Sequence, residues 1–226
     1  MPARMIIARL LALVLLTACT QDMSWEEYND AATEAYEQAR YAEAVELLLA
    51  GLEEAEKFGD QDPRLVTGFN NLAKLYHTQG KYAEAEPLFQ RSLAIEERAL
   101  GSEHPNVADV LNNLAALYDT QGKYVEAEAL YQRSLAIREK ALGPEHPDVA
   151  MSLNNLAFLY VNQGRYEEAE PLYQRALAIG EKALGPEHPY VAQSLENYAL
   201  LLRATDRNAE ADELEERARA IRAIAR

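Results

Sequence analysis

Asparagines recur along this chain at a constant interval, mostly as adjacent pairs. The members are Asn70 and Asn71, Asn112 and Asn113, Asn154 and Asn155, and the single Asn197. A carboxamide offers both a hydrogen-bond donor and an acceptor, so a row of them can bond to the N–H and C=O groups of another polypeptide whatever its side chains are. The alternative is that these side chains bond to neighbouring backbone, or that the pairs only reflect a recent duplication.

The residues around the asparagines change from one pair to the next, and helical spacing places several of them on the arc that the asparagines occupy. The further candidate binding residues are Lys74, Asp109, Asp119, Met151 and Phe158. Along the chain this surface is first basic, then acidic and finally apolar. His77 adds to the basic part, and Val161 and Leu200 add to the apolar part. A ligand with one apolar anchor and a basic residue nearby would suit such a surface. The alternative for Phe158 is burial against an adjacent helix.

Other residue types that could do chemistry are arranged unfavourably for it. His104, His146 and His188 recur at the same interval as the asparagines, each followed by Pro. Helices in contact lie about 8 to 10 Å apart, whereas the ligands of one zinc ion sit about 2 Å from it, so we interpret the His-Pro pairs as helix starts and expect no metal site. Cys19 is the only cysteine, no Gly-rich phosphate loop occurs, and the Glu pairs fall on helix faces that we expect to be solvated. We therefore expect no cofactor and no enzymatic activity.

Near-identical sequence units must position these side chains. The segments 80–121, 122–163 and 164–205 align without a gap, and the first two agree at 30 of 42 positions. Self-similarity at such a period indicates a solenoid, in which each unit buries its apolar face against its neighbours. Apolar stripes at 100° per residue predict two helices in each unit, with a turn at Gly122 between them and an end at Gly143. Ser24 followed by Glu27 has the pattern of a capping box, which predicts where the first helix starts.

Short motifs inside these units carry a family resemblance. They are Tyr-Ala-Glu-Ala at 82–85, Tyr-Val-Glu-Ala at 124–127 and Tyr-Glu-Glu-Ala at 166–169, with Leu-Ala at 72–73, 114–115 and 156–157. These motifs resemble tetratricopeptide repeats, and the 42-residue period, the Leu-Asn-Asn-Leu-Ala strings and the Gly-Pro-Glu-His-Pro linkers resemble the kinesin light chain subtype. The resemblance implies an all-α fold, a right-handed superhelical solenoid of about five antiparallel helix pairs. The repeats would cover about 24–59, 63–101, 105–143, 147–185 and 189–226.

The same resemblance implies a mode of binding. The first helices of such repeats line a concave groove, where asparagines hold an extended peptide by its backbone. The pattern departs at both ends, since the first unit is offset by one residue at Tyr41 and the last, at 206–211, has lost its Tyr. Atypical terminal repeats are expected of a solenoid, because their outer faces meet water.

The segment 1–18 is of a different kind. Arg4 and Arg9 precede an apolar run over 10–16, and small residues lead to Cys19, which is the arrangement of a secretory signal and too short to span a bilayer. Residues 16–19, Leu-Thr-Ala-Cys, resemble the lipobox of bacterial lipoproteins, which implies that Cys19 carries a lipid and that a short tether, 19–23, precedes the domain at 24–226. Thr20, where lipoproteins of the inner membrane often have Asp, implies the periplasmic side of the outer membrane. The alternative is an ordinary signal peptide or an uncleaved tail.

The composition bounds the partner. The formal net charge is -15, and it becomes -17 without Arg4 and Arg9, because segment 1–18 contains no acid. Nucleic-acid binders neutralise phosphates with Lys and Arg, so we expect no nucleic acid as a ligand. We expect a lipid-anchored, non-enzymatic adaptor that binds a peptide or helix of a partner protein and no small-molecule substrate. The alternatives are a self-associating structural subunit of an envelope assembly and, without a cleaved signal, an intracellular adaptor.

Overall fold

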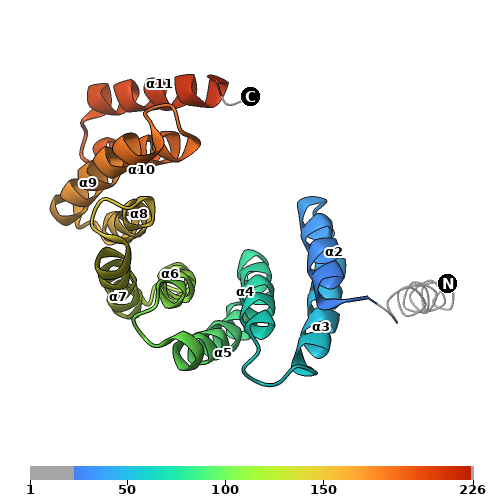
Figure 1. The fold of residues 1–226 in the computed structure, drawn as a ribbon. Helices are drawn as coiled ribbons and strands as arrows, with labels where there is room; N and C mark the ends of the chain where they lie inside the picture. Colours follow the sequence, from blue (N-terminus) through green and yellow to red (C-terminus); the bar gives the residue numbers. More distant parts are fainter. Residues whose placement is uncertain (1–22, 225–226) are drawn as a thin grey trace. The chain divides into compact units, whose positions relative to one another are not determined.

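The structure is a computed structural model that describes residues 23–224, so the leader predicted over 1–18, Cys19 and nearly all of the tether lie outside the described residues. Ten α-helices and no strand occupy the described part of the chain (Figure 1). The helices are α2 (Trp25–Glu37), α3 (Tyr41–Glu56), α4 (Pro63–Thr78), α5 (Tyr82–Leu100), α6 (Pro105–Thr120), α7 (Tyr124–Leu142), α8 (Pro147–Asn162), α9 (Tyr166–Leu184), α10 (Pro189–Ala204) and α11 (Asn208–Ile224). The prediction of an all-α repeat of five helix pairs is confirmed.

The chain divides into two compact units, with the boundary inside α5. Residues up to Ile95 form the first unit, which contains α2, α3, α4 and most of α5, and residues from Glu96 form the second, which contains α6 to α11. In the first unit α2 packs on α3, and in the second unit α6 packs on α7, α8 on α9 and α10 on α11. Within the second unit α6 also contacts α8, and α8 contacts α10, so the first helices of successive pairs lie side by side.

Helix starts follow the sequence signals. The side chain of Ser24 accepts a hydrogen bond from the Glu27 N–H (3.2 Å) while the Glu27 carboxylate accepts from the Ser24 N–H (2.7 Å), so the capping box is confirmed. His104, His146 and His188 each precede the proline that begins α6, α8 or α10. In each case the Nδ1 atom accepts a hydrogen bond of 3.2 Å from the backbone N–H two residues further on. The His-Pro pairs therefore do start helices, and each histidine satisfies an N–H that would otherwise lack an acceptor.

Glycines end helices where the sequence predicts turns. Gly122, between α6 and α7, has φ 72°, and Gly143, at the end of α7, has φ 91°. Both values lie in the left-handed region, where a residue without a Cβ atom avoids a steric penalty. The predicted turn and helix end are confirmed.

The core of the second unit is built from equivalent positions of successive pairs. One buried cluster combines alanines with larger side chains from α6 to α11, among them Ala115, Ala127, Tyr131, Leu156, Ala157, Ala169, Tyr173, Ala199, Leu202 and Ala211. Ala157 of α8 and Ala169 of α9 have no exposed surface. Burying these side chains removes apolar surface from water and stabilises the stacking of one pair on the next.

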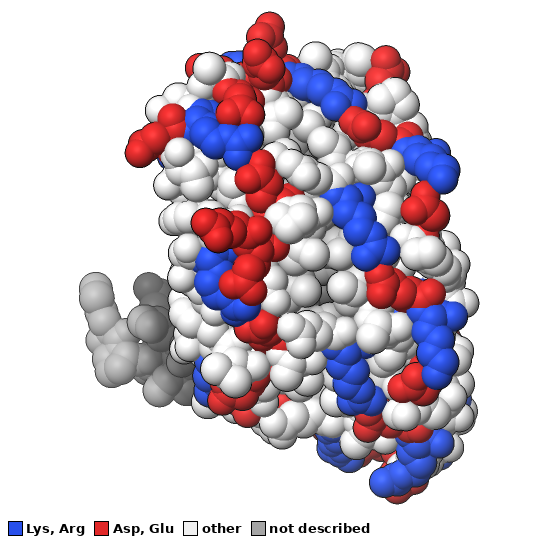
Figure 2. Space-filling model, turned by 90° about the vertical axis from the view of Figure 1, so that its left-hand side faces the viewer, with Lys and Arg blue, Asp and Glu red and all other residues white. Residues whose placement is uncertain are grey.

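Ion pairs also join the second helix of one repeat to the second helix of the next repeat. Arg133 of α7 pairs with Glu97 (2.5 Å), and the same pairing recurs between α9 and α7 and between α11 and α9. The side of the molecule that carries α7 and α9 shows basic and acidic side chains alternating in rows (Figure 2). Exposed ion pairs of this kind contribute about 0 to 1 kcal/mol each, so they add little to stability.

None of the helices in residues 23–224 combines the length and the apolar composition that a membrane span requires.

Candidate functional site

In the second unit, equivalent side chains on α6, α8 and α10 are exposed or half-buried. They follow one another at spacings of four and three residues along each helix, which places them on one helix face. We call this surface the A face. Its residues are Asp109, Asn113 and Ala116 of α6, Met151, Asn155, Phe158 and Asn162 of α8, and Gln193, Asn197 and Leu200 of α10. Because α8 contacts both α6 and α10, the three helices present the A face as one surface.

The asparagines of the A face differ in their hydrogen bonding. The Asn155 Nδ2 donates to the Oδ1 of Asn112 on the neighbouring helix (2.8 Å). Asn113 and Asn197 are half-buried, and their side chains make no hydrogen bond to any residue that the structure describes. The donors and acceptors of these two carboxamides are therefore not used by any described residue.

Two of the predicted binding asparagines lie elsewhere. Asn154 is 3% exposed, and its Nδ2 donates to the hydroxyls of Tyr190 (3.0 Å) and Ser194 (2.6 Å) on α10. Asn70 in the first unit donates in the same way to Ser92 of α5 (2.8 Å). Each is the first residue of an Asn-Asn pair, and one step along a helix turns a side chain by about 100°. The structure therefore buries Asn154 between helices, and it leaves Asn70 half-buried with its amide turned to Ser92.

Asp109 is exposed on the A face, but its charge is compensated. The guanidinium of Arg138, whose side chain is 3% exposed, pairs with Asp109. Arg138 also donates to the Ser152 hydroxyl (2.8 Å) and to the Asp148 carbonyl (3.1 Å) of α8. Sequence reasoning missed Arg138, although the equivalent positions of the adjacent repeats hold Glu96 and Gly180, a variation that marks a position with its own role.

Asp119, at the edge of the A face, has no such partner. Its carboxylate accepts two hydrogen bonds from the Nδ2 of Asn162 (3.1 and 3.2 Å), and within the described residues no cation pairs with it. Partial burial raises the pKa of Asp119. Burial and the nearby charge of Asp119 also raise the pKa of Tyr131 on α7. The acidic middle expected from the sequence therefore depends on one carboxylate, that of Asp119.

The apolar residues expected in the later part of the surface are exposed. Met151 is 40% exposed, Phe158 38% and Leu200 53%. Phe158 is thus not enclosed by an adjacent helix, which was the alternative. Val161 is half-buried and packs against the core cluster instead. The A face consequently combines carboxamides with apolar side chains, a mixture that suits the backbone and the side chains of a polypeptide.

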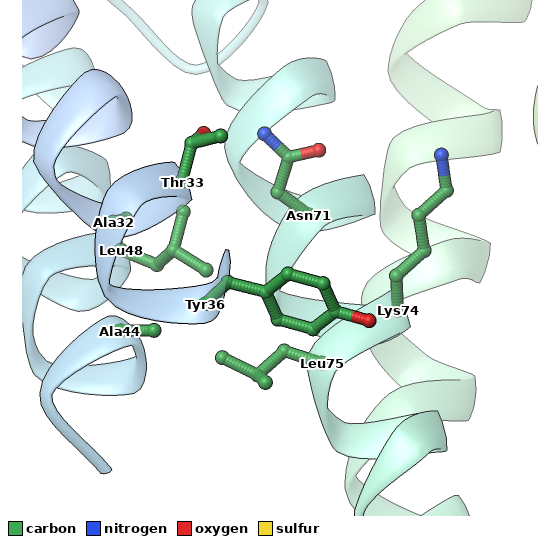
Figure 3. Close-up of a pocket in the computed structure, with 8 residues that line it drawn as sticks. All are labelled: Ala32, Thr33, Tyr36, Ala44, Leu48, Asn71, Lys74 and Leu75. Carbon is green, nitrogen blue, oxygen red and sulfur yellow. The ribbon is translucent and has the colours of Figure 1, made fainter. Parts of the chain in front are cut away.

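The first unit contains a hollow between α2, α3 and α4 of about 220 Å³ (Figure 3). It is lined by Ala32, Thr33, Tyr36, Ala44, Leu48, Asn71, Lys74 and Leu75. The Tyr36 ring extends from α2 toward α4, and Lys74 stands exposed on α4. Burial lowers the pKa of His77, so Lys74 supplies the positive charge expected for this part of the surface.

Asn29 of α2 belongs to the same series but was missed from the sequence. Its Oδ1 accepts a hydrogen bond from the Asn71 Nδ2 (3.4 Å), and its own Nδ2 donates to the Trp25 carbonyl (3.0 Å). Asn29 stands one full repeat period before Asn71, so the signal was present. The one-residue offset of the Tyr41 motif concealed it. The part of the chain that the structure describes holds no cluster of three or more His, Cys, Asp or Glu side chains that could bind a metal ion.

Comparisons with known proteins agree with this geometry. The profile of the tetratricopeptide repeat family matches residues 28–95, 64–140, 120–179 and 148–223. Nearly identical TPR-like repeats assigned to a kinesin light chain of Podosopora anserina share 32% identity, with a TM-score of 0.71 over 89% of this chain and 96% of that one. BtubC (BKLC) of P. vanneervenii shares 27% identity, with a TM-score of 0.75 over 88% and 80%.

A third structure shows likeness of fold alone. Rap protein complexed with competence and sporulation factor shares 13% identity, with a TM-score of 0.72 over 91% of this chain and 58% of that one. The comparison with curated proteins gave no match. Since the family profile covers nearly all of the helical part and the fold is that of kinesin light chain-like repeats, the chain belongs to the tetratricopeptide repeat family.

Proposed function

We propose that this protein is a non-enzymatic adaptor that binds a peptide or helix of a partner protein on the surface formed by the first helix of each repeat. We further propose that a lipid on Cys19 anchors it at the periplasmic side of the outer membrane. Tetratricopeptide repeats are protein–protein interaction modules. The observation that carries the proposal is the periodic series of asparagines, of which Asn113 and Asn197 keep unused donors and acceptors on the A face.

The mixed character of the A face supports a polypeptide ligand. Carboxamides can bond to main-chain groups of any peptide, whereas the exposed apolar side chains discriminate between ligand side chains. The rows of charged side chains on α7 and α9 are less suited to a ligand, because these charges already pair with one another.

The anchoring part of the proposal is supported by the sequence of the leader. The basic start, the short apolar run and the Leu-Thr-Ala-Cys segment ending at Cys19 have the order that a lipoprotein signal requires, which supports the proposal. Because a lipid occupies the only thiol, this proposal also accounts for an unpaired cysteine in an exported chain.

The test is crosslinking and pull-down from membranes of the native cell. We compare the wild-type protein with the double variant Asn113→Ala/Asn197→Ala and with Asn106→Ala as a matched control, an exposed asparagine at the start of α6. We expect one partner to copurify with the wild type and the control and to be lost with the double variant. If the catch contains only the protein itself, or is the same for all three, the adaptor proposal is refuted in favour of a self-associating subunit.

A further inference from the structure

Asp119 borders the A face, and no described residue compensates its charge. Two arginines of the second unit already pair with other acids: Arg138 with Asp109, and Arg203 with Asp212 and Glu215 of α11. The hydrogen bonds from Asn162 fix the Asp119 carboxylate but bring no charge. A half-buried carboxylate held in this way favours a cation supplied from outside the chain.

Apolar side chains lie next to this carboxylate. Phe158 and Asn162 are four residues apart on α8, so their Cβ atoms are about 5 to 6 Å apart on one helix face. Asn162 in turn touches Asp119 through its amide. Leu200 is the equivalent of Phe158 on α10, the helix in contact with α8. An exposed aromatic ring, an exposed leucine and an uncompensated acid thus stand together on adjoining helices.

Resting on the proposed function, we propose that the second unit selects a partner segment in which a large apolar side chain and a Lys or Arg are close in sequence. The apolar side chain lies against Phe158 and Leu200, and the cation pairs with Asp119. An extended chain rises about 3.3 Å per residue, so the separation of about 5 to 6 Å between Phe158 and Asn162, together with the further step from Asn162 to Asp119 on α6, corresponds to about two to four residues of the ligand.

The carboxamides complete the proposed site. Asn113 on α6 and Asn197 on α10 stand on the helices that flank Phe158, with their donors and acceptors unused by described residues. They bond to the ligand backbone and provide affinity that does not depend on its sequence. Asp119 and Phe158 then provide the preference for one sequence over another, so the two contributions can be separated by mutation.

The experiment is selection from a phage-displayed library of random dodecapeptides on the full-length protein, purified in mild detergent. The wild type should enrich peptides with Lys or Arg at a constant spacing of two to four residues from a large apolar residue. Asp119→Lys should exchange this preference for Asp or Glu at the same spacing. Phe158→Ala should remove the apolar preference, and Glu126→Lys, a charge reversal at an exposed position of α7, should change nothing.

Binding of one selected synthetic peptide then measures the size of the effect by fluorescence anisotropy. We expect replacing its Lys by Glu to weaken binding to the wild type about tenfold or more, and Asp119→Asn to abolish that difference. Thermal unfolding of each variant verifies that it is folded, and Asn162→Asp, which adds a second carboxylate, should strengthen the preference for Lys.

Failure of the inference and failure of the proposed function give different results. If the wild type enriches no peptide, both are refuted. If peptides are enriched and lost with Asn113→Ala/Asn197→Ala but carry no basic preference, or are the same with Asp119→Lys, the adaptor proposal stands and this inference is refuted.

Discussion

A single residue step along a helix separates asparagines with different roles in this protein. Asn154 is buried and bonds to Tyr190 and Ser194, whereas Asn155, one position further, contacts Asn112 at the A face. Asn154 thus connects adjacent repeats between the helices, whereas at the position of Asn155 in the flanking helices Asn113 and Asn197 leave their side chains at the surface without a bond to any described residue. Stability and binding should therefore respond to different members of the same pair.

We expect Asn154→Ala to lower the free energy of unfolding by about 1 to 3 kcal/mol, because the hydroxyls of Tyr190 and Ser194 lose a buried partner. Asn113→Ala should change it by less than about 0.5 kcal/mol, as is usual for a surface substitution. Urea denaturation of the two variants measures both values. Equal losses of stability would contradict the assignment of Asn113 to the surface.

Asp119 should reduce stability at neutral pH. Because partial burial raises the pKa of Asp119, the folded state binds its proton more tightly than the unfolded state does. The stabilising contribution of the protonated form is complete below the ordinary Asp pKa of about 3.9 and is lost as the pH rises through the raised value. Asp119→Asn, which stays neutral, should consequently be more stable than the wild type at pH 7 and similar to it below pH 4.

Denaturation curves at the two pH values test this expectation, with Glu126→Gln to measure the effect of net charge alone. A less stable Asp119→Asn variant at pH 7 would show that the carboxylate makes a favourable interaction in the folded protein. A more stable Asp119→Asn variant would agree with the proposal that Asp119 serves ligand binding at the expense of stability.

At the level of the elements, the first helix of each repeat from α4 to α10 starts in the same way, with a capping residue followed by Pro. Pro at the first helical position predicted the starts of α6, α8 and α10 from the sequence. The histidine caps themselves were not predictable, since the usual N-cap residues are Ser, Thr, Asp and Asn. Asp62 fills the equivalent position before α4, where its carboxylate accepts from the Arg64 N–H (2.9 Å). The chain itself therefore shows that Asp can replace His at this position.

Removing one cap should destabilise its helix. His188→Ala leaves the Tyr190 N–H at the start of α10 without its acceptor, and we expect a loss of about 1 kcal/mol in the free energy of unfolding. His188→Asp should keep most of that stability, as Asp62 does naturally. Thermal and urea unfolding measure both variants. If His188→Asp is as unstable as His188→Ala, the contribution of His188 is packing and not capping.

The close fit of the helix pairs gives a second expectation at this scale. Ala157 and Ala169 belong to one cluster and have no exposed surface, so a larger side chain has no room without moving a helix. We expect Ala157→Leu to reduce the free energy of unfolding by about 1 to 3 kcal/mol. Ala116→Leu, at a half-buried position of the A face, is the control and should cost less in the same urea titration. Equal effects would mean that the cluster contains unfilled space.

For the whole molecule, the repeat motifs carried the resemblance that predicted the family, and the period with its recurring apolar stripes predicted the number of helix pairs. The helix face on which a single residue lies was less predictable. The sequence does not distinguish the members of the Asn-Asn pairs, and only the structure shows that Asn70 and Asn154 bond to a neighbouring helix. The partner of Asp109 could not be predicted either, since Arg138 stands 29 residues away on another helix. The division within α5 has no signal, because α5 carries the same motif as α7 and α9.

The proposed anchor determines where the whole molecule acts. A lipidated Cys19 carries acyl chains whose buried methylenes contribute about 0.8 kcal/mol each, so several chains hold the protein firmly on a membrane. We expect Cys19→Ser to move it from the membrane to the soluble fraction, and Thr20→Asp to keep it membrane-bound but shift it from the outer to the inner membrane. Density-gradient fractionation with immunoblotting measures both, and mass spectrometry of the mature N-terminus identifies the lipid. If Cys19→Ser stays in the membrane fraction, another feature anchors the protein and the lipoprotein assignment is refuted. If the wild type itself is soluble, the A face binds its partner away from a membrane.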